Sequence, residues 1–355
     1  MATTFSALET SDDGSWTDDL ARQDRAIGGP PFDALLLWGA PIVALVLTFL
    51  WVTAAAAMPA GMGDRAVGVL LIGVGILTDA HLVAVVPRAY LNRDVFARHR
   101  LRLVAVPPLL VAALLLSPKL LACGVVLAIF WDVHHSAMQT FGLSRIYDAK
   151  AGNDTTALRR VDLLLNWALY VGPITMGAAL IAHFRWFDRF GEVGWQVLAQ
   201  VPAEISGAGA VIRLAGIAAW LAITGMAMFE YRRAARQGYR MPAHKLALLL
   251  STGSVSMAAW AFEPPFMAFA TVNIFHAVQY FALVWLKEGG RMRTLLGAHI
   301  RPGIIFGLFA IGCATFGVAY KLAVGWHILL APFVACSLLH FWFDGFVWSV
   351  RRREV

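Results

Sequence analysis

The chain has 355 residues, of which 59% are hydrophobic and only 14% are charged, and its formal net charge is +7. An ordinary soluble domain carries charge on roughly a quarter of its residues, whereas the apolar residues here fall in runs of about twenty, the length that crosses a bilayer. This composition excludes a soluble enzyme, a secreted disulfide scaffold, a coiled coil and a disordered protein. It predicts an all-α, polytopic integral membrane helical bundle with about ten transmembrane helices.

The first 33 residues predict a polar cytoplasmic tail. This segment contains Asp12 and Asp13 and lacks the basic start and apolar run of a cleavable signal peptide, so we expect insertion to begin at the first transmembrane helix. Residues 34–350 predict a single transmembrane domain, because neither a Gly/Ser-rich linker nor a tandem repeat divides them. Residues 351–355 predict a short basic cytoplasmic tail.

Hydropathy predicts ten transmembrane spans. The third is short and contains Pro107 and Pro108, which makes it the candidate for a broken or re-entrant segment. The connection 183–207 is the one long external loop, and its aromatic side chains Trp186, Phe187, Phe190 and Trp195 are expected in the membrane interface. The expected spans are residues 34–58, 66–87, 103–117, 120–142, 161–182, 208–229, 244–263, 266–286, 302–321 and 324–350.

The distribution of Lys and Arg predicts the orientation. With a cytoplasmic N-terminus, 23 of the 29 basic residues fall in inner segments, and the other six, Lys321 among them, fall in outer connections. Cytoplasmic loops carry the excess of Lys and Arg in membrane proteins, so we expect both termini in the cytoplasm and the chain in the cell inner membrane. Arg145, which follows the fourth span, is expected to snorkel to the membrane edge.

Polar side chains occur within four of the spans, although a charged one at mid-membrane costs about 2.5–3.5 kcal/mol. All four spans run from outside to inside, and one histidine of each lies roughly 9–15 Å above the cytoplasmic edge at a rise of about 1.5 Å per residue. A shared depth predicts one site. The polar residues are Asp79 and His81 in the second span; Asp132, His134, His135 and Gln139 in the fourth; Asn273, His276, Gln279 and Tyr280 in the eighth; and His340 and Asp344 in the tenth.

Helical phase selects among these residues. Asp132 and His135 share one face of the fourth span, whereas His134 points well away from it. Asn273 likewise lies one turn before His276 on the eighth span. In both pairs the polar side chain is expected to bond the second ring nitrogen of the histidine, which is how ligand histidines are usually held.

Neutral imidazole with carboxylate or amide oxygen suits iron, copper, zinc or manganese. The pattern therefore predicts one or two transition-metal ions, with iron as the favoured metal. Asp79 lies about 200° from His81 around the helix, so we expect only His81 to face the site. The predicted ligands are His81, His135, His276, His340 and Asp344; the predicted catalytic residues are Asp132, Gln139 and Gln279; and the residues predicted to surround the ligands are Asp79, His134, Asn273 and Tyr280.

Histidines on several apolar helices resemble, at the level of class, membrane-embedded non-haem metal oxygenases such as fatty-acid desaturases, alkane hydroxylases and bacterial carotene-cleaving dioxygenases. The HxxxH and HxxHH boxes of the desaturases do not occur here, where His134–His135 is the one adjacent pair, so the resemblance transfers no residue role. It implies dioxygen chemistry on a hydrophobic or lipid substrate from the bilayer. The implied partners are membrane lipids and an electron donor, and no nucleic acid.

Two other functions would use the same residues. A haem-binding electron carrier needs facing histidines at two depths, and His327 with His340 has that spacing, but no second helix offers a matching pair. A proton-coupled transporter would use the Asp and His residues as a relay. The leading prediction is a metal-dependent oxidoreductase with its His/Asp site in the cytoplasmic half of the bilayer.

Overall fold

The structure is a computed structural model that describes residues 16–59, 61–154, 156–323 and 327–348, with the side chain of His327 outside the described part. Every regular element in these ranges is a helix. Eight helices are long and apolar enough to cross a membrane, and the number rises to ten if each of two bent helix pairs is one span. The predicted all-helical architecture with multiple candidate spans is therefore confirmed.

The candidate spans follow the predicted order along the chain. α2 and α3 form one bent pair, with an angle of 41°, and α7 forms the other with the helices after it, with an angle of 95°. The spans are α2 (Pro30–Leu36) with α3 (Ala40–Ala56), α4 (Met62–Val83) with the π-helical turn η1 (Pro87–Leu91), α5 (Arg93–Leu116), α6 (Pro118–Lys150), α7 (Arg159–Met176) with α8 (Ala179–Phe184), α12 (Gly209–Ala235), α13 (Ala243–Ser256) with η3 (Met257–Phe262), α14 (Pro265–Leu296), α15 (Pro302–Ala323) and α16 (His327–Val347). The shorter helices are α1 (Trp16–Ala21), η2 (Arg185–Asp188), α9 (Arg189–Glu192), α10 (Gln196–Ala199) and α11 (Val201–Gly207).

The third span, α5, crosses its two prolines without a break. The expected interruption at Pro107 and Pro108 is absent, and the backbone departs from helical angles at His99 instead (φ −115°, ψ 17°). Pro107 has no N–H to donate to the carbonyl of Leu103 one turn earlier, and the hydroxyl of Tyr90 donates to that carbonyl over 3.0 Å. A side chain from η1 thus replaces the missing hydrogen bond, and the helix continues.

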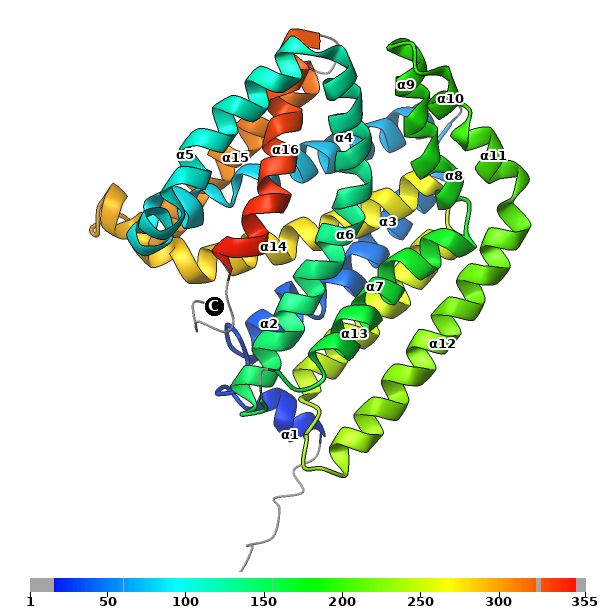
Figure 1. The fold of residues 1–355 in the computed structure, drawn as a ribbon. Helices are drawn as coiled ribbons and strands as arrows, with labels where there is room; N and C mark the ends of the chain where they lie inside the picture. Colours follow the sequence, from blue (N-terminus) through cyan, green and yellow to red (C-terminus); the bar gives the residue numbers. More distant parts are fainter. Residues whose placement is uncertain (1–15, 60, 155, 324–326, 349–355) are drawn as a thin grey trace, which may run out of the picture.

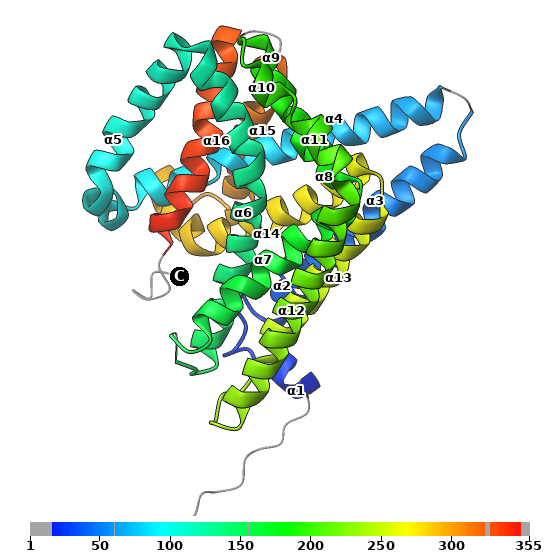
Figure 2. The ribbon, with the colours of Figure 1, turned by 45° about the vertical axis from the view of Figure 1, so that its right-hand side comes forward.

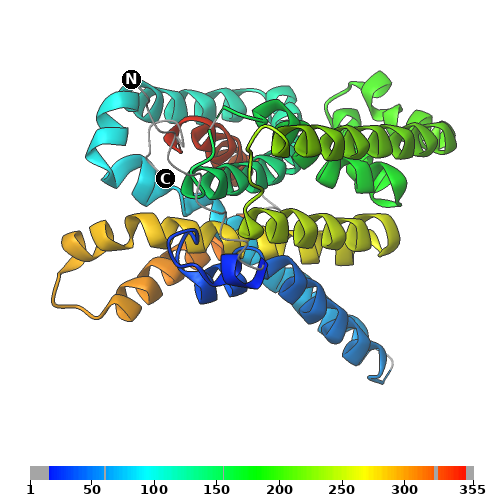
Figure 3. The ribbon, with the colours of Figure 1, turned by 90° about the horizontal axis from the view of Figure 1, so that it is seen from below.

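The helices pack in two layers, which Figure 3 shows from below. One layer consists of α5, α16, α6, α7 and α12, which contact one another in that order, and the other of α15, α4, α14 and α3. α13 packs against α6, α7 and α3 and joins the layers at one end. The close crossing of α4 and α15 depends on Gly317, where a Cβ atom would lie 2.3 Å from the carbonyl oxygen of Ile76. Figure 2 shows the connected ends of α3 and α4 extending beyond the other helices of their layer.

Two of the connections predicted to be cytoplasmic lie at a different end of the molecule from the predicted external loop 183–207. In Figure 1 the α6–α7 and α12–α13 connections lie at the bottom, near α1, whereas α9, α10 and α11 lie at the upper right. This separation fits a two-sided protein. The side that faces the cytoplasm stays a prediction.

Part of the predicted N-terminal tail is folded onto the bundle. α1 contacts α13, and a carboxylate oxygen of Asp19 accepts the first backbone N–H of α13 over 2.9 Å. Asp33 is buried, and its carboxylate accepts two backbone N–H groups at 2.7 and 2.8 Å. Residues 16–33 therefore pack against the helices, while the acidic start of the tail and the basic residues 351–355 lie outside the described residues.

The predicted external loop 183–207 contains the short helices η2, α9, α10 and α11. Phe190 is buried, and it packs together with Phe187 and Trp195 against α6 near Val126. These aromatic side chains cover a helix of the bundle, and their predicted place in the membrane interface stays a prediction. The apolar surface of α6 at this end gives these side chains more hydrophobic contact than they would have within the loop alone.

Candidate metal centre

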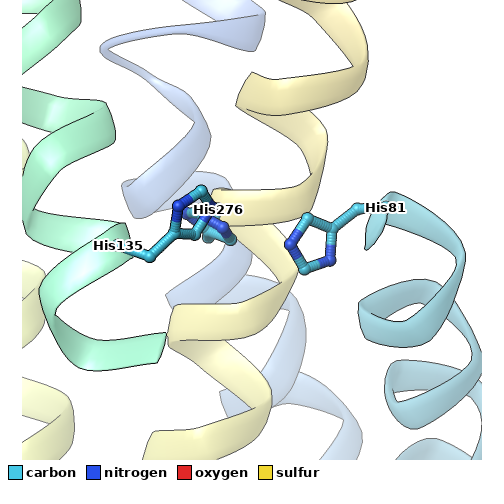
Figure 4. A group of neighbouring side chains, drawn as sticks. All are labelled: His81, His135 and His276. Carbon is cyan, nitrogen blue, oxygen red and sulfur yellow. The ribbon is translucent and has the colours of Figure 1, made fainter. Parts of the chain in front are cut away.

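Four histidines meet between the two layers. His135 on α6 and His340 on α16 come from one layer, and His81 on α4 and His276 on α14 come from the other. Five pairs of their rings have centroids 4.8–6.3 Å apart, and none of the four residues is more than 4% exposed. Figure 4 shows three of them converging from α4, α6 and α14. The convergence predicted from depth is found, and we call these four residues the histidine cluster.

The ring nitrogens of the histidine cluster are largely without protein partners. The Nδ1 atom of His81 lies in hydrogen-bond contact with the carbonyl of Thr78, which leaves its Nε2 atom free of partners among the described residues. Both ring nitrogens of His276 are likewise unpartnered in the described part of the chain. The Nε2 atoms of His135 and His340 face each other at 3.2 Å. A buried polar atom without a partner costs about 1–3 kcal/mol, and the lone pairs of these nitrogens could bind a cation.

Asp344 adds a carboxylate to the histidine cluster. Its Oδ1 atom accepts hydrogen bonds from the hydroxyl of Tyr280 at 2.7 Å and from the indole N–H of Trp348 at 3.1 Å. Its Oδ2 atom lies 3.8 Å from Nδ1 of His135 and 3.8 Å from Nε2 of His340. Two donors thus hold one oxygen, and the other oxygen lies beside the imidazoles.

The donor set fits a transition metal. One ligand atom from each of His81, His135 and His276 can be chosen so that all three lie within 4.8 Å of one another, and the same holds for His135, His340 and Asp344. Two nitrogens bound to one ion at about 2.1 Å each and at a right angle are about 3 Å apart, close to the 3.2 Å between His135 and His340. Imidazole and carboxylate ligands suit first-row metals, iron included.

The predicted bond from Asn273 to the cluster is absent. Its side-chain amide donates to the backbone carbonyl of Phe269, one turn earlier, at 2.9 Å, and His276 keeps both ring nitrogens unpartnered among the described residues. An amide within a helix can bond the carbonyl one turn back, and here this local bond prevails over the histidine on the same face. His135 contacts His340 and Asp344, while Asp132 lines a cavity beside the cluster.

Gln139 and Gln279 bond to backbone groups and to each other. The amide of Gln139 donates to the carbonyl of His276 at 3.1 Å and to the side-chain oxygen of Gln279 at 2.9 Å. The amide of Gln279 in turn donates to the carbonyl of Leu37, just after α2, at 2.7 Å. Both residues were predicted to be catalytic, and that role stays a prediction. Their bonds link α6 and α14 to each other and to the turn between α2 and α3, near His276.

Asp79 and His134 lie on the sides of their helices that face other partners. The carboxylate of Asp79 pairs with the ammonium of Lys321, in the last turn of α15, at 2.7 Å; the predicted external side of Lys321 stays a prediction. The ring of His134 lies 5.3 Å from that of Trp167 on α7. Helical phase had separated each of them from its neighbouring cluster histidine, and the contacts agree with that separation.

A cavity of about 1040 Å³ begins beside the histidine cluster. His81 and Asp132 line it close to the cluster, and Trp186 and Val193, on the segment at the upper right of Figure 1, line it farther away. Most of the other lining side chains are apolar. Tyr170, which sequence analysis did not single out, also lines this cavity. The cavity thus joins a mainly apolar wall to one histidine of the cluster, His81.

Arg145 does not snorkel. Its side chain is buried and pairs with the carboxylates of Asp148, at 2.7 Å, and of Asp162. Lys245 is also buried and reaches the same two carboxylates at 2.7 and 2.9 Å. We call Arg145, Asp148, Asp162 and Lys245 the ion cluster. Arg145 and Asp148 lie three residues apart on α6, but Asp162 and Lys245 come from α7 and α13, so the sequence pattern of one helix does not show the whole cluster.

Comparisons with protein-family models, with curated proteins and with solved structures find no match for this chain.

Proposed function

We propose that the chain is a membrane-embedded, metal-dependent oxidoreductase that acts on a lipid-soluble substrate. The observation that carries the proposal is the histidine cluster, in which buried imidazole nitrogens from four helices meet beside a carboxylate and lack protein partners among the described residues. A group of lone pairs with so few donors is suited to a cation. The proposed ligands are His81, His135, His276, His340 and Asp344.

Iron is the metal we propose, as one or two ions, because open sites with histidine and carboxylate ligands are those of non-haem iron oxygenases. When bound, iron would supply one-electron chemistry and a site for dioxygen. The protein residues have separate tasks. The carbonyl of Thr78 sets the ring orientation of His81, the carboxylate of Asp344 offsets the charge of a cation, and Tyr280 and Trp348 hold that carboxylate in place.

The substrate is proposed to be a hydrophobic or lipid molecule from the bilayer. The cavity beside the histidine cluster is lined mainly by apolar side chains and is large enough, at about 1040 Å³, for a molecule of drug or lipid size. Apolar walls also exclude water from the reacting atoms. An electron donor and the surrounding lipids are the other proposed partners, and no nucleic acid is expected.

A proton-coupled transporter is the second candidate. The ion pair of Asp79 and Lys321 lines the same cavity, and intramembrane charges often mark ion pathways. A haem carrier is less supported, since its planar macrocycle needs a gap between two axial imidazoles, whereas rings of the histidine cluster pack edge to face at 4.8–4.9 Å.

The deciding experiment is elemental analysis and absorption spectroscopy of the full chain purified in lipid nanodiscs. We expect a first-row transition metal at near-integral stoichiometry and no Soret band. Protein that is metal-free and does not bind added Fe(II), Mn(II) or Zn(II) would overturn the metal proposal in favour of transport. A Soret band would replace it with a haem protein.

Location in the inner membrane with cytoplasmic termini is part of the proposal, and reporter fusions test it. Because 23 of 29 basic residues fall on one side, a reporter after Val355 should read cytoplasmic and one inserted at Gly194 should read external. Two reporters on the same side would contradict the proposed orientation.

A further inference from the structure

A line of polar side chains runs along α6 away from the cavity. Asp132, Ser136, Thr140, Ser144 and Asp148 follow one another at intervals of four residues, so each lies about one helical turn from the next and is turned by about 40° around the helix. Ser136, Thr140, Ser144 and Asp148 are all buried. A membrane helix has no need of five polar residues at this spacing in order to insert.

The neighbouring helices continue this line. On α7, Asp162, Asn166 and Tyr170 have the same spacing, and the hydroxyl of Tyr170 lies 2.9 Å from that of Thr140. The side-chain amide of Asn166 donates to the backbone carbonyl of Asp162 at 2.8 Å. α6 and α7 thus face each other with polar groups over several turns.

α13 adds polar side chains on a third side of the space between α6 and α7. Lys245 points between α6 and α7, since it bonds both carboxylates of the ion cluster. Thr252 and Ser256 lie seven and eleven residues later, which places all three side chains within about 40° of one face. We call these residues of α6, α7 and α13 together the polar column.

Three groups in the polar column are not satisfied by protein. The side-chain oxygens of Asn166, Thr252 and Ser256 have no hydrogen-bond partner among the described residues, and all three side chains are 0% exposed. Buried polar groups of this kind are usually satisfied by internal water, which needs two to four polar partners. The polar column offers such partners on three helices.

The two ends of the polar column reach different environments. Asp132, Ser136 and Tyr170 line the cavity beside the histidine cluster. At the other end Asp148 accepts a hydrogen bond from the hydroxyl of Tyr239 at 2.7 Å. Tyr239 is half-buried and belongs to the α12–α13 connection, at the bottom of Figure 1, where its neighbours are exposed.

We propose that water fills the polar column and that it conducts protons between the surface at the α12–α13 connection and Asp132 in the cavity wall. A proton enters from bulk water, and each water or hydroxyl along the column accepts one proton and passes one on. The net change is one proton lost by bulk water and one gained by the carboxylate of Asp132. The pathway goes beyond the proposed oxidoreductase function and does not depend on it.

The test follows protonation of Asp132 directly. The full chain in nanodiscs is subjected to a pH jump, and time-resolved infrared spectroscopy records the carboxyl band that Asp132→Asn removes. We expect Asn166→Leu, which fills the polar column with an apolar side chain of similar size, to slow the appearance of this band at least about tenfold. Thr140→Val should also slow the appearance of the Asp132 carboxyl band.

Thr48→Val is the matched control. Thr48 is buried and shares a 2.7 Å hydrogen bond with Thr271 between α3 and α14, outside the polar column, so its loss should leave the rate unchanged. Wild-type rates in both column variants would overturn the proposal and leave the polar column a structural feature.

If the variants do not fold, the wild-type protein still decides. An experimental structure that resolves water should contain density beside Asn166, Thr252 and Ser256, and a dry column would overturn the proposal. Neither measurement requires metal or turnover, so failure of the pathway and failure of the metal proposal are distinguishable.

Discussion

The histidine cluster and the ion cluster are both buried, polar and assembled from several helices, yet they differ in how their bonding capacity is used. In the ion cluster, two cations and two carboxylates balance, and the ammonium of Lys245 reaches both carboxylates within 3 Å. In the histidine cluster, Nε2 of His81 and both nitrogens of His276 have no partner among the described residues. Burial of polar side chains therefore does not by itself mark a functional site. Buried donors and acceptors without a protein partner distinguish the proposed metal site from the ion cluster, because such groups are rare in folded proteins and are otherwise satisfied by water or an ion.

The largest effect should follow from removal of a cluster histidine. His135→Ala deletes a proposed ligand, and we expect the affinity for the metal to fall by more than about 100-fold, since loss of a residue that merely supports a ligand already costs 10–100-fold. Competition with a chelator, followed by metal analysis, measures the change.

His134→Ala is the control for that experiment. It removes the same side chain from the adjacent position, where the ring lies against Trp167. We expect unchanged metal content and a loss of stability of about 0.6–2 kcal/mol. Equal metal loss in both variants would show that helical phase has identified the wrong face.

The ion cluster should respond in the opposite way. Lys245→Met leaves two carboxylates with one cation, and breaking a buried pair of this kind costs about 3–5 kcal/mol. We expect the free energy of unfolding to fall by that amount while metal affinity stays within about twofold of wild type. Denaturant unfolding and metal titration on the same sample separate the two effects.

An exposed ion pair provides the comparison for Lys245. Arg189 and Glu192 pair at 3.1 Å with side chains 43% and 55% exposed, so Arg189→Ala should cost less than about 1 kcal/mol. A similar small cost for Lys245→Met would mean that the ion cluster is accessible to water.

An intermediate effect is expected at the crossing of α4 and α15, which positions His81. A methyl group at Gly317 would lie 2.3 Å from the carbonyl oxygen of Ile76, whereas one at Gly312 meets nothing within 4 Å. Gly317→Ala should therefore cost about 1–3 kcal/mol by overpacking and weaken metal binding through His81. Gly312→Ala should be neutral or stabilising by up to about 1 kcal/mol. Thermal unfolding and metal titration of both variants check this, and equal behaviour would contradict the close crossing.

The smallest effect concerns Tyr239, next to the ion cluster. Burial, followed by the carboxylate of Asp148, raises the pKa of Tyr239 above its ordinary value of 10.0. The folded state then holds this proton more tightly than the unfolded chain does, so the contribution is complete below about pH 10 and is lost as the pH rises through the folded pKa. Tyr239→Phe should cost about 1 kcal/mol at neutral pH and reduce the decline of stability above pH 10. An unchanged alkaline decline in unfolding experiments would contradict this role.

Depth and helical phase predicted which residues form the histidine cluster, but the hydrogen bonds expected around the cluster were predicted less well. Depth and phase placed His81, His135, His276 and His340 together, because both quantities depend only on the helical repeat. The orienting bond of Asn273 was wrong, since an amide on a helix can bond either a histidine on its face or the carbonyl one turn back, and the sequence does not decide between them. The regular spacing of polar residues on α6 from Ser136 to Asp148 was visible in the sequence. Whether these residues belong to a polar column depends on the polar side chains that α7 and α13 place beside them.

Composition and hydropathy by themselves determined that the chain is a bundle of apolar helices with histidines at a common depth, because span length and helical phase are properties of short segments. Only the tertiary structure decided which of the buried polar groups are satisfied. Lys321 pairs with Asp79, 242 residues earlier in the chain, and Lys245 joins carboxylates on two other helices. Such pairing depends on which helices become neighbours, and that is set by packing over the whole bundle, as at Gly317, where α15 can approach α4 only because no side chain intervenes.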